Sequence, residues 1–174
     1  MLNRIMGVLK LDANTFEEIE HDQGATMEAL IIVIVVALVS GLGSGVLSDN
    51  FIGGFLSSAI SAVIGWLVWS ATTYFVGTSL FGGKADMGEM MRVIGYSYAP
   101  QILSFIPCVG FLALLWSLAA GFIAVRQGLD LDNVKALLTI VVGFILVLIV
   151  SFVLGLIFGV GVLGIGALTG ALGG

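Results

Sequence analysis

The side chains that could carry chemistry in this sequence are few. The 174 residues contain one cysteine, Cys108, and one histidine, His21, far apart in the chain. A nucleophilic thiol needs a base beside it, and a single cysteine forms neither an internal disulfide nor a multi-cysteine metal cluster. The sequence has no HExxH, no paired intramembrane aspartates and no Ser/Lys arrangement of the kind hydrolases use. We therefore expect a protein that is not an enzyme, with no catalytic residue, no metal site and no cofactor.

Acidic side chains gather ahead of the first apolar run. This cluster allows two interpretations, a solvated surface or a surface on which a partner docks. Its lone histidine lacks the spacing of a metal ligand set. Thr15 and Glu18 have the spacing of a capping box and predict the start of a short helix. The candidate docking residues are Glu17, Glu18, Glu20 and Asp22.

A second group of polar and aromatic residues lies between Arg92 and Arg126. Two prolines there remove backbone donors and predict a kink and a turn. A transporter, channel or lipid-handling protein could use such a kinked hairpin to line a path, with Tyr96, Gln101 and Trp116 along it. The candidate residues of this hairpin site are Gly95, Tyr96, Tyr98, Pro100, Gln101, Pro107, Gly110 and Trp116.

The elements that carry these residues must lie in a membrane. Hydrophobic residues make up 59% of the chain and charged ones 10%, and the mean hydropathy is +1.19. A helix needs about 20 apolar residues to cross the hydrocarbon, and four uncharged runs are that long. We expect an all-α, polytopic membrane helix bundle. The uncharged runs are 29–48, 50–83, 93–125 and 136–174.

Basic residues predict the orientation, because they favour the cytoplasmic side. The six Lys and Arg residues lie in three segments of the chain. These segments all lie on the cytoplasmic side if the N-terminus is cytoplasmic and the C-terminus is on the opposite side. Charge leaves open whether the hairpin 93–125 spans fully or is re-entrant. The predicted spans, about five, are 29–47, 55–81, 93–106, 108–125 and 136–158. They form a membrane domain, 29–158, which follows a cytoplasmic amphipathic and acidic segment, 1–28. A Gly-rich tail, 159–174, comes after it, and the sequence does not determine the conformation of this tail.

Two patterns predict how helices contact their surroundings. Leu2, Ile5, Met6 and Leu9 recur at helical spacing and predict an interfacial amphipathic helix. Small residues recur on the second and last spans, where they allow close helix packing, either inside the bundle or between protein molecules. These packing residues are Gly53, Ser57, Ser61, Gly65, Gly155 and Gly159.

The run Gly95-Tyr96-Ser97-Tyr98-Ala99-Pro100, followed by Ile106, Pro107, Gly110 and Trp116, resembles the central signature of the Yip-one (Ypt-interacting protein) domain family. The likeness extends from about residue 10 to 158 and is closest to small prokaryotic members. It implies five spans with a cytoplasmic N-terminus. In eukaryotic relatives it implies vesicle trafficking and binding of small GTPases. This chain lacks the acidic-Leu-Tyr-Gly-Pro segment of those relatives, which argues against a GTPase partner.

The combined prediction is a non-enzymatic scaffold or adaptor in membrane organisation or trafficking. Its expected partners are the lipid bilayer and other membrane proteins or a second copy of the chain, and no nucleic acid. The expected location is a prokaryotic plasma membrane. The alternative is a small transporter, channel or lipid-handling protein that uses the hairpin 93–125.

Overall fold

The structure is a computed structural model that describes residues 1–45, 51–105 and 109–172, and the side-chain surroundings within them except at 41–45, 51, 54, 105 and 157–172. These residues form helices and no strand, as the all-α prediction requires. The helices are α1 (Leu2–Leu9), α2 (Ala13–His21), α3 (Ala25–Gly45), α4 (Phe51–Phe81), α5 (Met87–Ser97), the 3-10 helix η1 (Ala99–Phe105), α6 (Val109–Gly128) and α7 (Asn133–Leu172).

Three described helices are long and apolar enough to cross a membrane: Phe55–Phe81, Val109–Gly128 and Asn133–Leu156. A fourth crossing exists if α2 and the Ala25–Ser40 part of α3, which meet at a bend of 117°, form one broken span. The chain is therefore a multi-pass membrane protein, and the number of five spans stays a prediction.

The structure differs from the predicted hairpin in the first of its two arms. Residues 93–106 were expected to form one short span, whereas the helix there begins earlier, at Met87, and gives way after Ser97 to the 3-10 helix η1. Pro100 lies at the start of η1, where its missing N–H is tolerated. Pro107 and Cys108, at the predicted turn, lie outside the described residues.

The start of α2 corrects one prediction. Asp12 is the N-cap, and its carboxylate accepts hydrogen bonds from the Asn14 N–H and the Thr15 hydroxyl, both at 3.1 Å. The predicted Thr15/Glu18 capping box is wrong because Thr15 already lies inside the first turn. A capping box does occur at α5, where the Glu89 N–H donates to Asp86 at 2.7 Å and the Asp86 N–H donates to Glu89 at 2.6 Å.

Helix α1 packs against the bundle on one side. Val8 is fully buried and Ile5 packs against the core, whereas Leu2 and Met6 are 78% and 53% exposed. The predicted interfacial face is therefore divided, and the Leu2 and Met6 side alone remains open to a headgroup layer. We call residues 1–24, which include α1 and α2, the N-terminal cap.

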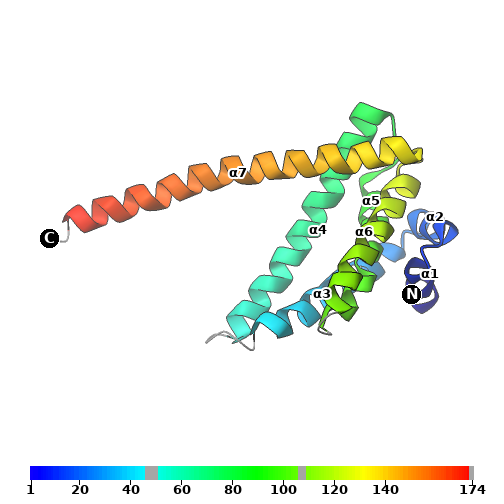
Figure 1. Ribbon diagram of the computed structural model, residues 1–174, viewed down its shortest axis with the longest axis horizontal. Coiled ribbons are helices and arrows are strands. Elements are labelled where there is room, and N and C mark those ends of the chain that lie inside the picture. Colours follow the sequence, from blue (N-terminus) through cyan, green and yellow to red (C-terminus); the bar gives the residue numbers. More distant parts are fainter. Residues whose placement is uncertain (46–50, 106–108, 173–174) are drawn as a thin grey trace.

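The core lies where the cap meets α3, α5 and α6. Its largest fully buried side chains include Phe16, Ile19, Ile32, Met90 and Tyr96. Along α4, α6 and α7, in contrast, many large apolar side chains face outward, which suits helices whose solvent is lipid. Figure 1 shows α7 crossing α4 near its own start and then running away from the other helices to the C-terminus.

Candidate functional site

Helix α5 carries the first part of the Gly-Tyr-x-x-x-Pro run and packs closely on α3. A Cβ built on Gly95 would lie 2.7 Å from the Ala29 Cβ and 3.1 Å from the Trp66 indole nitrogen. That nitrogen donates a hydrogen bond to the Met91 carbonyl at 2.9 Å, which ties α4 to α5. Position 95 therefore needs glycine for steric reasons, because any side chain would push these helices apart.

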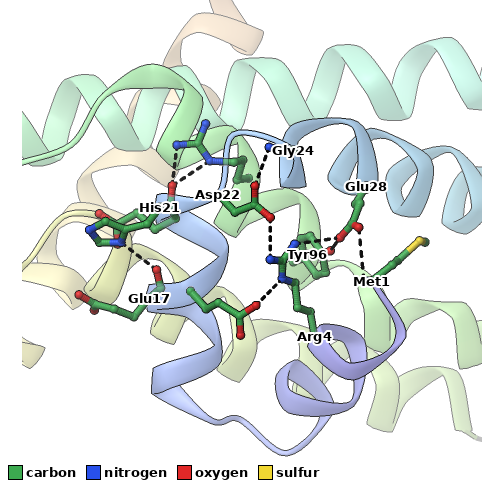
Figure 2. A network of polar contacts seen from close by, with 11 residues as sticks. Met1, Arg4, Glu17, His21, Asp22, Gly24, Glu28 and Tyr96 are labelled. Carbon is green, nitrogen blue, oxygen red and sulfur yellow. Dashed lines mark hydrogen bonds and ion pairs between the residues drawn. The ribbon is translucent and has the colours of Figure 1, made fainter.

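The next residue, Tyr96, joins a charged network that links the cap to the bundle (Figure 2). Its hydroxyl donates to the Glu28 carboxylate of α3. Arg4 of α1 donates to Glu18 at 2.9 Å, to Asp22 at 2.6 Å and to Glu28 at 3.3 Å. We call these five residues the Arg4 network. The Met1 ammonium also lies 3.3 Å from Glu28, as Figure 2 shows.

Electrostatics in the Arg4 network agree with its geometry. The Arg4 guanidinium, together with the Gly24 N–H, holds the pKa of the Asp22 carboxyl below its usual range. Three carboxylates converge on one guanidinium that is mostly withdrawn from solvent, and their repulsion is offset by charge-assisted hydrogen bonds. The network therefore fixes α1, α2 and the start of α3 relative to α5.

Arg92 makes a second link between the cap and α5. Its side chain is 6% exposed and donates to the Glu20 carbonyl at 2.9 Å and 2.5 Å. Glu20 is 5% exposed as a residue, and its Oε2 has no hydrogen-bond partner. Burial, with added repulsion from Glu89 and Asp130, raises the pKa of Glu20 to about 7.

The four candidate docking residues consequently differ in access. Glu17 and Glu18 are exposed, although Glu17 accepts a 3.2 Å hydrogen bond from Gln127 and Glu18 pairs with Arg4. Asp22 is partly covered and paired with Arg4, and Glu20 is buried. A partner would therefore contact Glu17 and Glu18, whereas Glu20 faces the protein interior.

Tyr98 and Gln101 lie beyond the turn that ends α5 and line two cavities. One cavity, of 150 Å³, lies among α4, the end of α5, α6 and α7, and the other, of 230 Å³, lies between η1 and the α3/α4 pair. Ser97 and Ser117 join the first cavity, and Ser40 and Ser58 join the second. The two cavities have walls that are mainly apolar but carry several neutral hydrogen-bonding groups.

Trp116 lies elsewhere. Its indole N–H donates to the Leu9 carbonyl of α1 at 2.9 Å, and it lines an apolar cavity of 250 Å³ with Pro100. The structure places the three residues of the hypothetical path in different settings: Tyr96 in the Arg4 network, Gln101 beside the 150 Å³ and 230 Å³ cavities, and Trp116 against α1. Gly110 packs near the Ser104 carbonyl.

The small-residue pattern faces outward in a single chain. Gly53, Ser57, Ser61 and Gly65 are exposed, and Cβ atoms built on Gly65 and Gly155 would meet nothing within 4 Å. Gly159 lies among the residues whose side-chain surroundings are not described. Packing within this bundle therefore does not use Gly65 or Gly155, and contact between protein molecules stays a prediction.

Several site residues escaped sequence reasoning. Arg4 and Glu28 were not among the candidate residues, and Arg92 served only as a boundary of the hairpin. Pairing between positions far apart in sequence leaves no periodic signal, but a carboxylate at the start of an apolar helix, such as Glu28, is costly enough to imply a partner. Over the described ranges, no group of three or more His, Cys, Asp or Glu residues could hold a metal ion.

These features define an all-α, multi-pass membrane protein whose N-terminal helices are fixed to the bundle by buried charges. The chain belongs to the Yip1 domain family, since the Yip1 domain matches residues 6–169. The family predicted from the Gly-Tyr-x-x-x-Pro run is thereby confirmed. Comparison with curated proteins and with solved structures gave no match.

Proposed function

We propose that this Yip1-domain protein is a non-enzymatic membrane scaffold or adaptor that presents its N-terminal cap to other membrane proteins. The observation that supports this most is the double attachment of the cap. Arg4 bonds to Glu18, Asp22 and Glu28, and Arg92 bonds to the Glu20 backbone, so α1 and α2 are held in one geometry. A pre-organised surface loses less conformational entropy when a partner binds.

The proposed orientation places this cap in the cytoplasm. Arg92 bonds to the cap, Gln127 beside Arg126 donates to Glu17 of the cap, and the Lys84 N–H donates to the Leu129 carbonyl close by. These contacts place Arg92, Arg126 and Lys84 near α2. Basic residues favour the cytoplasmic side. Glu17 and Glu18 then face the cytoplasm, where they suit a partner with basic residues. The expected location remains a prokaryotic plasma membrane.

Photo-cross-linking from two positions tests the scaffold. A photoreactive amino acid replaces Glu17 on the cap or Leu137, which is 54% exposed on the apolar surface of α7. We expect discrete protein adducts from position 17 in native membranes and lipid adducts alone from position 137. Absence of protein adducts from position 17, or the same adducts from both positions, would contradict the proposal.

The second candidate function is lipid or solute handling, and the cavities at Tyr98 and Gln101 favour it. Proteoliposomes containing the purified protein separate the two candidates. A scaffold leaves the permeability of vesicles to small neutral solutes unchanged, whereas a channel or transporter raises it.

A further inference from the structure

The 150 Å³ cavity has the properties of a binding site that the scaffold role does not use. Side chains from the end of α5 and from η1, α4, α6 and α7 surround it. Trp69, Phe122 and Ile140 supply apolar wall, and Ser97, Tyr98, Gln101 and Ser117 supply hydrogen-bonding groups. Small-molecule sites combine an apolar lining with a few polar groups in this way.

One polar group in this cavity has no partner. Ser117 is 7% exposed and lines the cavity, and its Oγ makes no hydrogen bond. Other hydroxyls of these helices bond to their own backbone: Thr73 donates to the Trp69 carbonyl at 2.8 Å, and Ser97 to the Ile94 carbonyl at 2.7 Å. Leaving a buried hydroxyl unpaired destabilises the folded protein, and a ligand that pairs with it recovers part of that cost.

The lining is free of charge. No Asp, Glu, Lys, Arg or His contributes to it. Phosphate, carboxylate and ammonium groups would therefore lie in an apolar setting without a counter-ion among the described lining residues, which is unfavourable. Neutral groups that both donate and accept hydrogen bonds match the serine hydroxyls and the Gln101 amide.

The position of the cavity further narrows its ligand. Ser117 precedes the end of α6 at Gly128 by about 16 Å of helix, and α6 is one of the helices that are long and apolar enough to cross a membrane. Leu114 and Leu118, at the rim, are 49% and 62% exposed on the apolar surface of α6. A ligand can therefore enter sideways from the bilayer and leave its apolar tail outside. A phospholipid headgroup would find no counter-ion among the described residues that line the cavity.

We propose that the cavity lined by Ser97, Gln101 and Ser117 binds the uncharged hydroxyl and ester groups of a neutral glycerolipid such as a diacylglycerol. Ser117 and Gln101 exchange hydrogen bonds with the glycerol part, and the acyl chains leave between Leu114 and Leu118. This site is independent of the N-terminal cap, so it can fail while the scaffold proposal stands, and the reverse also holds.

The test uses the purified full chain in lipid nanodiscs and radiolabelled dioctanoylglycerol. We expect saturable binding that Ser117→Ala and Gln101→Leu each weaken by about fivefold, the value of one hydrogen bond. Gly121→Leu, which inserts a side chain into the cavity, should abolish binding. Ser70→Ala is the matched control because Ser70 is also a buried, unpartnered hydroxyl of a neighbouring helix but does not line this cavity.

Competitors identify the source of the ligand. Unlabelled dioctanoylglycerol should displace the label, whereas dioctanoylphosphatidylcholine and free glycerol should not. Displacement by free glycerol at equal concentration would overturn the lipid assignment in favour of a small polyol. Absence of saturable binding, or equal weakening of binding by Ser70→Ala, would overturn the proposed site. If Gly121→Leu does not fold, the binding measured for the folded Ser117→Ala variant still tests the proposal.

Discussion

Charged residues of the cap and of the start of α3 differ in how their burial is compensated. Glu20 is the clearest case because the residue is buried and its Oε2 lacks a hydrogen-bond partner, while its backbone carbonyl binds Arg92. Glu28 is the opposite case, because its partly buried carboxylate accepts a hydrogen bond from the buried Tyr96 and pairs with Arg4. A charge that lacks a partner destabilises the fold, whereas one that is hydrogen-bonded holds elements together.

Glu20 predicts a pH dependence of stability. Its pKa is about 7 in the folded protein against an ordinary value of 4.5. Between these values the folded protein retains a proton that the unfolded chain releases, so stability falls as pH rises from 4.5 to 7 and stays lower above it. Glu20→Gln should remove this loss and stabilise the protein at pH 8 by up to about 3 kcal/mol, with little effect at pH 4.

Thermal unfolding in mild detergent from pH 4 to pH 8 measures this effect. Glu17→Gln, at an exposed position of the same helix, is the control and should leave the profile unchanged. Parallel profiles for the original protein and Glu20→Gln would refute the predicted role of Glu20.

Tyr96→Phe tests the Arg4 network. The variant removes the hydroxyl that donates to Glu28 and should destabilise the protein by about 1.5 to 3 kcal/mol, the range for hydrogen bonds to charged groups. A double-mutant cycle with Glu28→Gln, followed by thermal unfolding, measures the coupling. Additive effects of the two substitutions would show that the pair contributes no coupling energy.

At the scale of elements, α5 depends on close contact with α3. Gly95→Ala places a methyl group 2.7 Å from the Ala29 Cβ, and we expect a loss of about 1 to 3 kcal/mol by overpacking. Gly65→Ala, on an open face of α4, should be neutral or mildly stabilising since Ala has the higher helix propensity. Comparison of the two melting temperatures is the measurement, and equal shifts would argue against close α3/α5 packing.

Hydropathy could predict most elements and few of their contacts. The predicted spans 55–81 and 108–125 coincide closely with α4 and α6, because an apolar run bounded by charges has one simple solution in a bilayer. The first hairpin arm could not be predicted so well: Met87 to Arg92 is polar enough to look like a loop, yet a capping box and burial of Arg92 make it helical. The partners of individual side chains could not be predicted from the sequence, since residues such as Tyr96 and Glu28 meet only through tertiary packing.

At the scale of the whole molecule, Arg92, Lys84 and the end of α6 that carries Arg126 lie near α2 of the cap. Cysteine accessibility tests the proposed orientation in a Cys108→Ala background. Lys84→Cys and Lys135→Cys should react with an impermeant maleimide only after the membrane is opened, whereas Asp49→Cys should react in intact cells. Labelling of Lys84→Cys in intact cells would reverse the orientation and place the cap outside.

The lengths of α4 and α7 relate the fold to the membrane that surrounds it. Their apolar spans, Phe55–Phe81 with 27 residues and Asn133–Leu156 with 24, measure about 40 Å and 36 Å, against about 30 Å of hydrocarbon. This hydrophobic mismatch is relieved by tilting the helices or by thickening the surrounding lipid. Since the two helices cross near the start of α7 (Figure 1), a change in bilayer thickness should alter their crossing angle. The length of both spans should also favour residence of the protein in the thicker regions of a membrane.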